Sequence, residues 1–169
     1  MNHRVLSACI AAAALLPGAA PAQRPENLAS LQGTWEMVSA YEIKADGTRS
    51  TNYGEHPLGL LTVDAAHRYN MQIFRIGRSV FASGDKARGT PDEYRQAVVG
   101  SSTHFGTVTI DTAKHELVFD VKAASFPNWE GKRQVSDYTF KDGLLTYAVP
   151  AAASSSGIVA YSIWRRAAP

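Results

Sequence analysis

Three titratable side chains, those of His104, Asp137 and Tyr147, are predicted to share one face of a β-sheet. A turn at residues 141–143 makes Phe140 oppose Leu144 and so places Asp137 opposite Tyr147. The register of this pairing matters because a slip of one residue turns every side chain of a strand to the other face. An inward carboxylate is costly unless it is hydrogen-bonded, and in this register the Tyr147 hydroxyl is the available donor.

Three interpretations of these side chains stay open. Asp137 and Tyr147 form a core pair that fixes the register, or they form the polar end of an apolar ligand cavity together with His104. In the third interpretation one of these groups moves a proton in catalysis.

A second hairpin supports the same inner face. If Asp111 opposes Glu116, Val108 faces Phe119 and His104 faces Ala123. The two registers together gather apolar side chains on the inner face, namely Val108, Ile110, Leu117, Phe119, Val121, Val135, Leu145 and Val149. The outer face then receives mainly polar ones, namely Thr107, Thr109, Asp120, Lys122, Gln134 and Ser136.

Further aromatic and sulfur-containing side chains could line a cavity. Tyr41, Tyr69 and Met71 share the apolar face of their strands, so they are core residues, or cavity lining if the interior is hollow. Trp129 lies in the loop 125–132. It either covers an open end and contacts ligand, or packs with Phe126 to hold its own loop on the sheet.

Eight short strands are expected to carry these residues. Apolar and polar residues alternate from Trp35 to Ile43, which is typical of a half-buried strand. Seven further strands are predicted over 58–64, 68–76, 104–111, 116–123, 133–140, 144–149 and 158–166. Many short strands separated by turns indicate a sandwich or an up-and-down barrel. One helix should begin with the capping box of Thr90 and Glu93, end near Gly100 and lie over one end of the structure.

The first 22 residues have the features of a secretory signal peptide. Arg4 precedes an apolar run, and the small residues Ala20 and Ala22 mark a cleavage site. We therefore expect a periplasmic or secreted protein cut near Ala22, with a linker over 23–30 and one domain over 31–166. The apolar run is too short to span a membrane, and no membrane insertion is expected after cleavage.

Composition excludes several classes of function. Cleavage would remove Cys9, the one cysteine, and would lower the formal net charge from +2 to +1. Thiol chemistry is then excluded, and so small a net charge predicts no nucleic-acid partner. The histidines outside the predicted signal peptide show no metal-ligand spacing, and no glycine loop has a phosphate-binding pattern. We predict neither a metal nor a cofactor.

Cations exceed acidic residues between Arg75 and Arg95. Such a stretch is either a solvated loop and helix, or a weakly positive rim that attracts an anionic head group such as a fatty acid carboxylate.

Both ends of the expected domain resemble those of lipocalins and other calycins. The motif Gly33-Thr34-Trp35 opens the first strand, and Trp164-Arg165-Arg166 ends the last. The resemblance implies that the first tryptophan plugs the closed end of a barrel and that an arginine of the last strand packs over it.

Further motifs resemble the bacterial and fungal lipocalin-like domain family across residues 31–166. They are Leu31 to Ser39, Gly59 to Thr62, Phe81 to Asp85, Gly89 to Glu93, Phe105 to Thr107 and Ser125 to Gly131. The resemblance implies an eight-stranded antiparallel β-barrel with one short helical insertion. Relatives often carry histidine before the Phe-Pro-Asn-Trp loop, where this chain has Phe119-Asp120-Val121. We therefore do not expect this chain to have any catalytic chemistry that those histidines carry out in relatives.

Three functions follow as hypotheses. The first is binding of a small apolar molecule, buried by Phe119 and Met71 and oriented by His104, Asp137 and Tyr147. The second is an isomerase or cyclase of a hydrophobic metabolite, with Asp137 or His104 supplying a proton. The third is a filled barrel whose outer surface binds another protein. The oligomeric state is not predicted.

Overall fold

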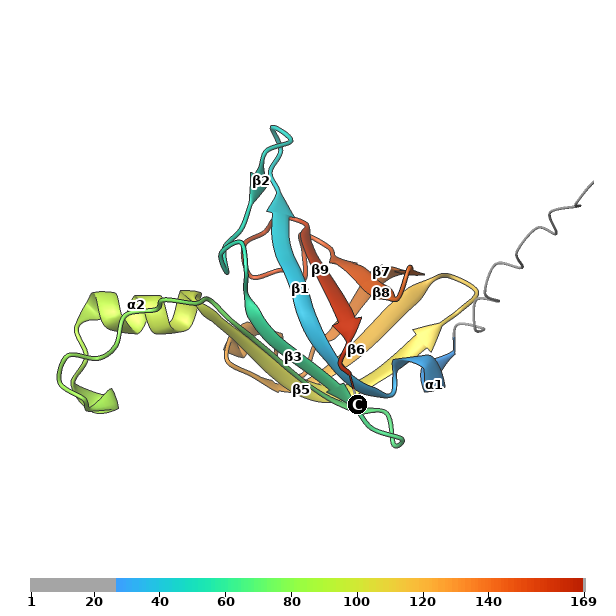
Figure 1. The fold of residues 1–169 in the computed structure, drawn as a ribbon, viewed down its shortest axis with the longest axis horizontal. Coiled ribbons are helices and arrows are strands. Elements are labelled where there is room, and N and C mark those ends of the chain that lie inside the picture. The colour runs from blue at the N-terminus through green and yellow to red at the C-terminus, as the bar shows by residue number, and fades with distance from the viewer. Residues whose placement is uncertain (1–26, 169) are drawn as a thin grey trace, which may run out of the picture.

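The computed structural model describes residues 27–168 as a closed antiparallel barrel of eight strands (Figure 1). The barrel strands are β1 (Gly33–Ile43), β3 (Leu58–Val63), β4 (Arg68–Phe74), β5 (Ser101–Asp111), β6 (Glu116–Ala124), β7 (Arg133–Lys141), β8 (Leu144–Val149) and β9 (Ala160–Arg166). Each strand pairs with the next, and β1 pairs with β9 to close the ring. The predicted eight-stranded barrel is confirmed. The predicted signal peptide, residues 1–22, lies outside the described residues.

Short elements surround the barrel. The two-residue strand β2 (Arg49–Ser50) pairs with the C-terminal end of β1. The helix α1 (Leu28–Leu31) precedes the N-terminal end of β1. Two 3-10 turns, η1 (Lys86–Arg88) and η2 (Pro127–Trp129), lie in connections. In residues 27–168, no helix is long and apolar enough to cross a membrane.

The Gly-Thr-Trp motif closes the α1 end of the barrel. Trp35 is fully buried, its Nε1 donates to the Leu31 carbonyl at 2.8 Å, and the guanidinium of Arg166 lies 4.4 Å above its ring. Arg166 also donates to the backbone carbonyls of Gln32 and Ser30. Gly33 has φ +115°, and a Cβ there would meet Arg166 Nη1 at 2.7 Å, so glycine is required at this position. The predicted arginine-over-tryptophan contact is confirmed.

A β-bulge changes the inward face of β1. Strand β9 pairs with Met37 and then with Ser39, which leaves Val38 as an extra residue. Before the bulge Trp35 faces inward; after it Ala40 and Glu42 are buried. The predicted strict alternation through Tyr41 is therefore wrong beyond Val38.

The hairpin of β5 and β6 has the predicted register along most of its length. Asp111 pairs with Glu116 and Val108 with Phe119. His104 pairs with Ala124 rather than Ala123, because a bulge shifts the register beyond Gly106. His104 nevertheless faces inward and is buried.

The hairpin of β7 and β8 has a different register from the predicted one. Its turn consists of two residues, Asp142 and Gly143, with φ 52° and 76°, as a type I′ turn requires. Lys141 therefore opposes Leu144, and Tyr138 rather than Asp137 opposes Tyr147. This one-residue difference reverses every face of β7. Gln134 and Ser136 are buried, whereas Val135 and Asp137 face outward.

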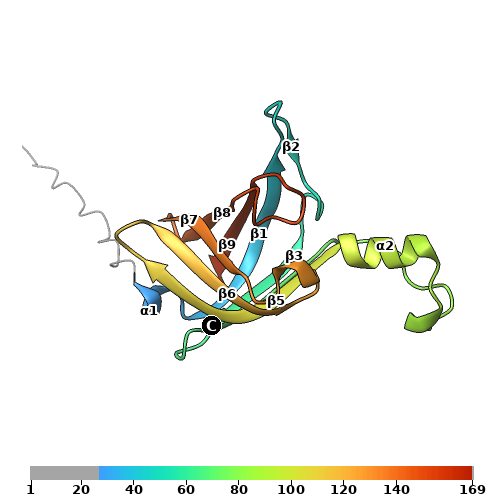
Figure 2. The same ribbon diagram turned by 180° about the vertical axis from the view of Figure 1, so that it is seen from behind.

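The helix α2 (Pro91–Val99) begins at the predicted capping box, since Thr90 and Glu93 hydrogen-bond each other's backbone. With η1 it forms an arm, residues 75–100, that joins β4 to β5 and projects away from the barrel (Figures 1 and 2). The helix therefore does not cover a barrel end, contrary to our expectation. No residue of α2 is buried.

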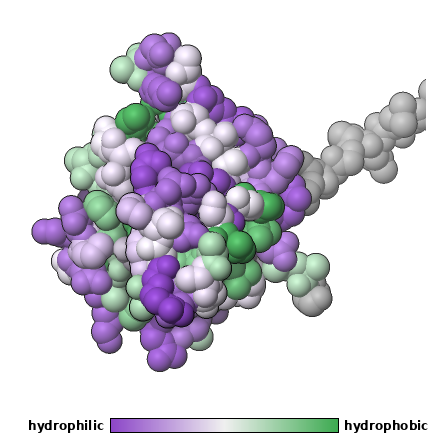
Figure 3. All heavy atoms as spheres, turned by 90° about the vertical axis from the view of Figure 1, so that its left-hand side faces the viewer, coloured by the Kyte–Doolittle hydropathy of each residue, from purple (hydrophilic) through white to green (hydrophobic). Residues whose placement is uncertain are grey.

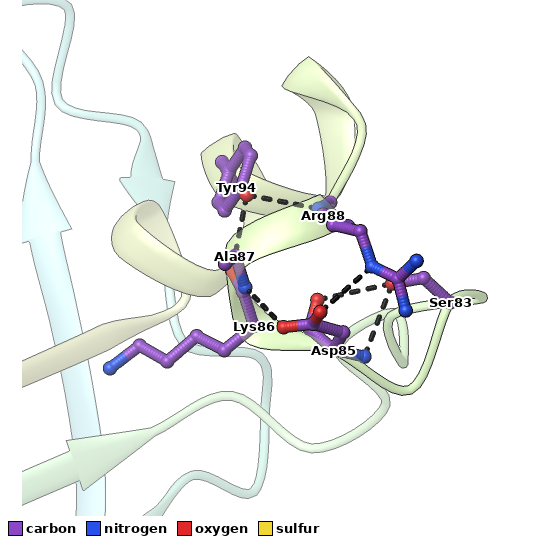
Figure 4. A network of polar contacts seen from close by, with 7 residues as sticks. Ser83, Asp85, Lys86, Ala87, Arg88 and Tyr94 are labelled. Carbon is purple, nitrogen blue, oxygen red and sulfur yellow. Dashed lines mark hydrogen bonds and ion pairs between the residues drawn. The ribbon is translucent and has the colours of Figure 1, made fainter.

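Internal contacts give the arm its order (Figure 4). Asp85 accepts from the backbone of Ala87 and from Arg88 Nε at 2.8 Å. The Tyr94 hydroxyl accepts from Gly89 N and donates to the Lys86 carbonyl. The arm thus organises itself through its own side chains rather than through the barrel core.

The outer face of the arm mixes apolar and polar residues (Figure 3). Its most exposed apolar side chains are Ile76, Val80, Val98 and Val99. The positive rim, one of the two interpretations of the cations in this stretch, stays a prediction.

Candidate functional site

The candidate site is a cavity of about 70 Å³ inside the barrel. It lies toward the end opposite α1, where the residues after β2, the η2 loop and the β8–β9 connection border it. The lining includes six of the residues predicted from the sequence: Tyr41, Met71, His104, Phe119, Trp129 and Tyr147. The barrel therefore brings these side chains together from six different elements. That they bind a ligand stays a prediction.

His104 lies at the centre of an aromatic cluster. Its Nδ1 is 2.7 Å from the Tyr69 hydroxyl, and the rings of Phe119 and Trp129 lie 6.2 Å and 5.5 Å from its own. Burial disfavours the imidazolium and lowers the pKa of His104 to about 4. The side chain is therefore neutral at pH 7. Tyr69 does not line the cavity itself but orients the residue that does.

The Tyr147 hydroxyl has a different partner from the predicted one. It donates to Met71 Sδ at 3.1 Å, across the barrel interior. Burial raises the pKa of Tyr147 to about 12, so the hydroxyl keeps its proton. Asp137 is exposed on the outer face and pairs with Ala148. The predicted Asp137–Tyr147 pair is wrong, because the two-residue Asp142-Gly143 turn shifts β7 by one position.

Trp129 packs on its own loop and also lines the cavity, and its contact with a ligand stays a prediction. Its ring packs edge-on against Phe126 at 5.4 Å, which holds the η2 loop, and the same ring lines the cavity. Its Nε1 donates to the Ala153 carbonyl at 2.9 Å and so ties η2 to the β8–β9 connection. A second tie joins that connection to β1, since Ser156 donates to Glu42. These two bonds hold the connection at the mouth of the cavity.

Tyr41 lies at the margin of the cavity. Its ring stacks on Tyr161 at 5.0 Å, with the guanidinium of Arg49 4.2 Å from its centroid. The bulge at Val38 explains this position, because it gives the inner face to Ala40 and Glu42.

Sequence reasoning missed several polar residues of the lining. Glu42, Ser102, Gln134 and Ser162 are buried and border the cavity. The predicted register puts Gln134 on the outer face, and only the turn type corrects it. Asp-Gly is the usual sequence of a two-residue hairpin turn, so this signal was available in the chain.

The described residues offer no metal centre. Among residues 27–168, no group of three or more histidine, cysteine, aspartate or glutamate side chains is placed to hold a metal ion. The chemistry that the cavity offers is burial of apolar atoms beside a few neutral hydrogen-bonding groups.

Comparison with known proteins agrees with this architecture. The sequence profile of the lipocalin-like domain family matches residues 32–167. The chain belongs to this family. Among proteins of curated function, no sequence matches it significantly.

One solved structure that resembles the chain is that of a mutant of the fluorescent protein UnaG. The two chains are 18% identical, the alignment covers 82% of this chain and 96% of that one, and the TM-score is 0.37. At this level of similarity nothing about the ligand is transferred.

Proposed function

We propose that this lipocalin-like protein binds a small hydrophobic molecule inside its barrel. The observation that carries the proposal is the cavity bordered by Met71, Phe119, Trp129 and Tyr147. Concave, mainly apolar sites with a few polar groups are the usual form of small-molecule sites. The interior of an eight-stranded barrel is either filled by side chains or holds one small ligand, and the cavity favours the second case here.

The cavity limits the size of the buried part of the ligand. Its volume of about 70 Å³ is well below the roughly 300–1,000 Å³ of common ligand pockets. Burial of each methylene group contributes about 0.8 kcal/mol. Affinity for a homologous series should therefore rise with chain length and reach a plateau when the cavity is full.

A series of 2-alkanones from five to twelve carbons tests the proposal. Binding is followed by the indole ¹H–¹⁵N resonance of Trp129, with that of Trp35 at the closed end as an internal reference. We expect the Trp129 resonance to shift and the affinity to level off within the series. Absence of any shift across the series would contradict the proposal.

A matched pair of variants locates the site. Ala40→Leu fills the cavity from β1, because Ala40 is buried in its lining. Ala148→Leu makes the same change on the outer face of β8, next to Tyr147 along the strand. Ala40→Leu should weaken binding at least tenfold and Ala148→Leu should not. Equal affinities would place binding elsewhere.

The isomerase or cyclase alternative has less support. Asp137, one of its two candidate proton donors, is on the outer face, and His104 is neutral at pH 7. No geometric feature of the described residues favours turnover over binding, so we propose binding alone.

Export is a further part of the proposal. Arg4, the apolar run after it, and Ala20 and Ala22 support cleavage near Ala22 and a periplasmic or secreted protein. Mass determination on the protein recovered from each compartment tests this. A chain beginning at Gln23 outside the cytoplasm is expected, and an uncleaved cytoplasmic chain would contradict export.

A further inference from the structure

Two buried polar side chains flank Phe119 inside the cavity. His104 comes from β5 and Gln134 from β7, with 4% and 5% of their surfaces exposed. Gln134 is paired directly with Phe119 across β6 and β7, and the His104 ring lies edge-on to the same aromatic ring. Cross-strand neighbours lie about 5 Å apart at Cβ. Both polar side chains therefore lie next to Phe119 and border the same cavity.

His104 presents a hydrogen-bond donor. The Tyr69 hydroxyl keeps its proton, because burial raises its pKa. In the tautomer that carries its proton on Nε2, Nδ1 accepts from this hydroxyl at 2.7 Å, and Nε2 is left as a donor. The inference below uses this tautomer.

Gln134 presents a second donor. Its Nε2 is buried and has no hydrogen-bond partner among the described residues. A buried donor without a partner costs about 1–3 kcal/mol, and most such groups in proteins are satisfied. Gln134 lines the cavity, so a ligand acceptor can supply the missing partner.

The charge of the lining opposes an anionic ligand. Within residues 27–168, Glu42 is the one charged residue of the lining, which contains neither lysine nor arginine. Arg75 approaches the same end, but its Nε donates to the Asn52 carbonyl and its side chain does not border the cavity. A carboxylate would be buried near Glu42 without a cation to pair with, which is unfavourable.

We propose that the cavity selects an uncharged ligand with a carbonyl-type oxygen, which accepts hydrogen bonds from Gln134 Nε2 and His104 Nε2, and that it discriminates against carboxylates. This inference rests on the proposed function and adds the chemical class of the ligand. Aldehydes, ketones, esters and amides belong to that class, and fatty acid anions do not.

Three probes of nearly equal size test the inference at pH 8. Hexan-2-one carries the acceptor, 2-methylhex-1-ene replaces its oxygen by a methylene group, and hexanoate carries a negative charge. Dissociation constants are measured for the wild-type protein, Gln134→Leu, His104→Phe and Glu42→Gln. Gln134→Leu removes a buried unpaired polar group, so it should fold, and far-ultraviolet circular dichroism checks this.

The expected result has two parts. Hexan-2-one should bind at least tenfold more tightly than hexanoate to the wild-type protein. Glu42→Gln should reduce this difference in affinity, because it should increase the affinity for hexanoate. Gln134→Leu should lower the affinity for hexan-2-one relative to 2-methylhex-1-ene by about fivefold, the usual contribution of one neutral hydrogen bond. His104→Phe should also lower the affinity for hexan-2-one relative to 2-methylhex-1-ene, because it removes the donor His104 Nε2.

The outcomes separate the inference from the proposed function. If the ketone-to-alkene ratio is the same in the wild type, Gln134→Leu and His104→Phe, or if hexanoate binds as tightly as hexan-2-one, the inference is overturned while hydrophobic binding stands. If none of the three probes binds, the inference and the proposed function are both overturned.

Discussion

At the scale of single side chains, burial sets the charge of His104 and makes stability depend on pH. The pKa of His104 is about 4 in the folded protein against 6.5 for an exposed histidine. Between these values the unfolded chain binds a proton that the folded protein does not. The free energy of unfolding is therefore highest above pH 6.5 and falls as the pH drops toward 4, by about 3 kcal/mol in total.

Urea denaturation at a series of pH values measures this dependence. His104→Gln serves as the control, because glutamine keeps a polar group near Tyr69 without titrating. The variant should lose the slope between pH 6.5 and 4.5, whereas the losses at lower pH, to which Asp64 and Glu93 contribute, should remain. An identical slope in both proteins would contradict the assignment.

A second prediction for a single residue concerns Gly143 in the β7–β8 turn. Its φ of 76° is unfavourable for residues with a Cβ by roughly 1–2 kcal/mol. Gly143→Ala should lower the free energy of unfolding by about 1 kcal/mol, and Asp142→Gly should be nearly neutral, since glycine adopts φ 52° readily. Thermal denaturation of the two variants measures the difference. If both behave alike, the turn does not have this geometry.

At the scale of elements, the arm should open independently of the barrel. A Cβ on Gly89 would meet the Phe81 ring at 2.3 Å and so separate Phe81 from Tyr94. Gly89→Ala should therefore raise amide hydrogen exchange in residues 79–99 at least tenfold and leave the barrel strands unchanged. Val80→Ala, at a position that is 84% exposed, is the control. Equal loss of protection in arm and barrel would show that they unfold as one unit.

The elements also show what the sequence could predict. Alternation and turn residues placed all eight barrel strands within about three residues of their observed ends, and the capping box placed α2. The prediction of which side chains face inward was wrong where a single residue changes the register. The bulge at Val38 puts Tyr41 on a different face from the predicted one. The two-residue turn at Asp142, in place of the predicted three-residue turn, does the same for Gln134 and Asp137. Periodicity carries no information about a single inserted residue.

At the scale of the whole molecule, closure of the barrel depends on both ends of the domain meeting. Arg166 near the C-terminus contacts Trp35, the backbone of α1 at Ser30 and that of Gln32 directly after it. Arg166→Ala should lower the free energy of unfolding by about 2 kcal/mol through loss of the cation–π contact and two charged hydrogen bonds.

Arg165→Ala is the matched control, because Arg165 is exposed on the adjacent position of β9 and such changes usually alter stability by less than about 0.5 kcal/mol. Urea denaturation of both variants gives the comparison. A similar effect of the two substitutions would mean that Arg166 acts only through the net charge.

The bulge at Val38 has a consequence for how such a cavity could diversify. Deleting Val38 would leave the pairs Met37–Trp164 and Ser39–Ile163 adjacent, so the bulge would disappear while Ala40 and Glu42 stayed on the inner side. Adding one residue after Ser39 would instead turn Tyr41 to the inner side and Glu42 to the outer side. The cavity would then exchange its acidic group for an aromatic one in a single step. Determining the structure of the insertion variant would show whether β1 reverses its faces or forms a second bulge. In this barrel, an insertion within a strand is therefore a route to new ligand preference.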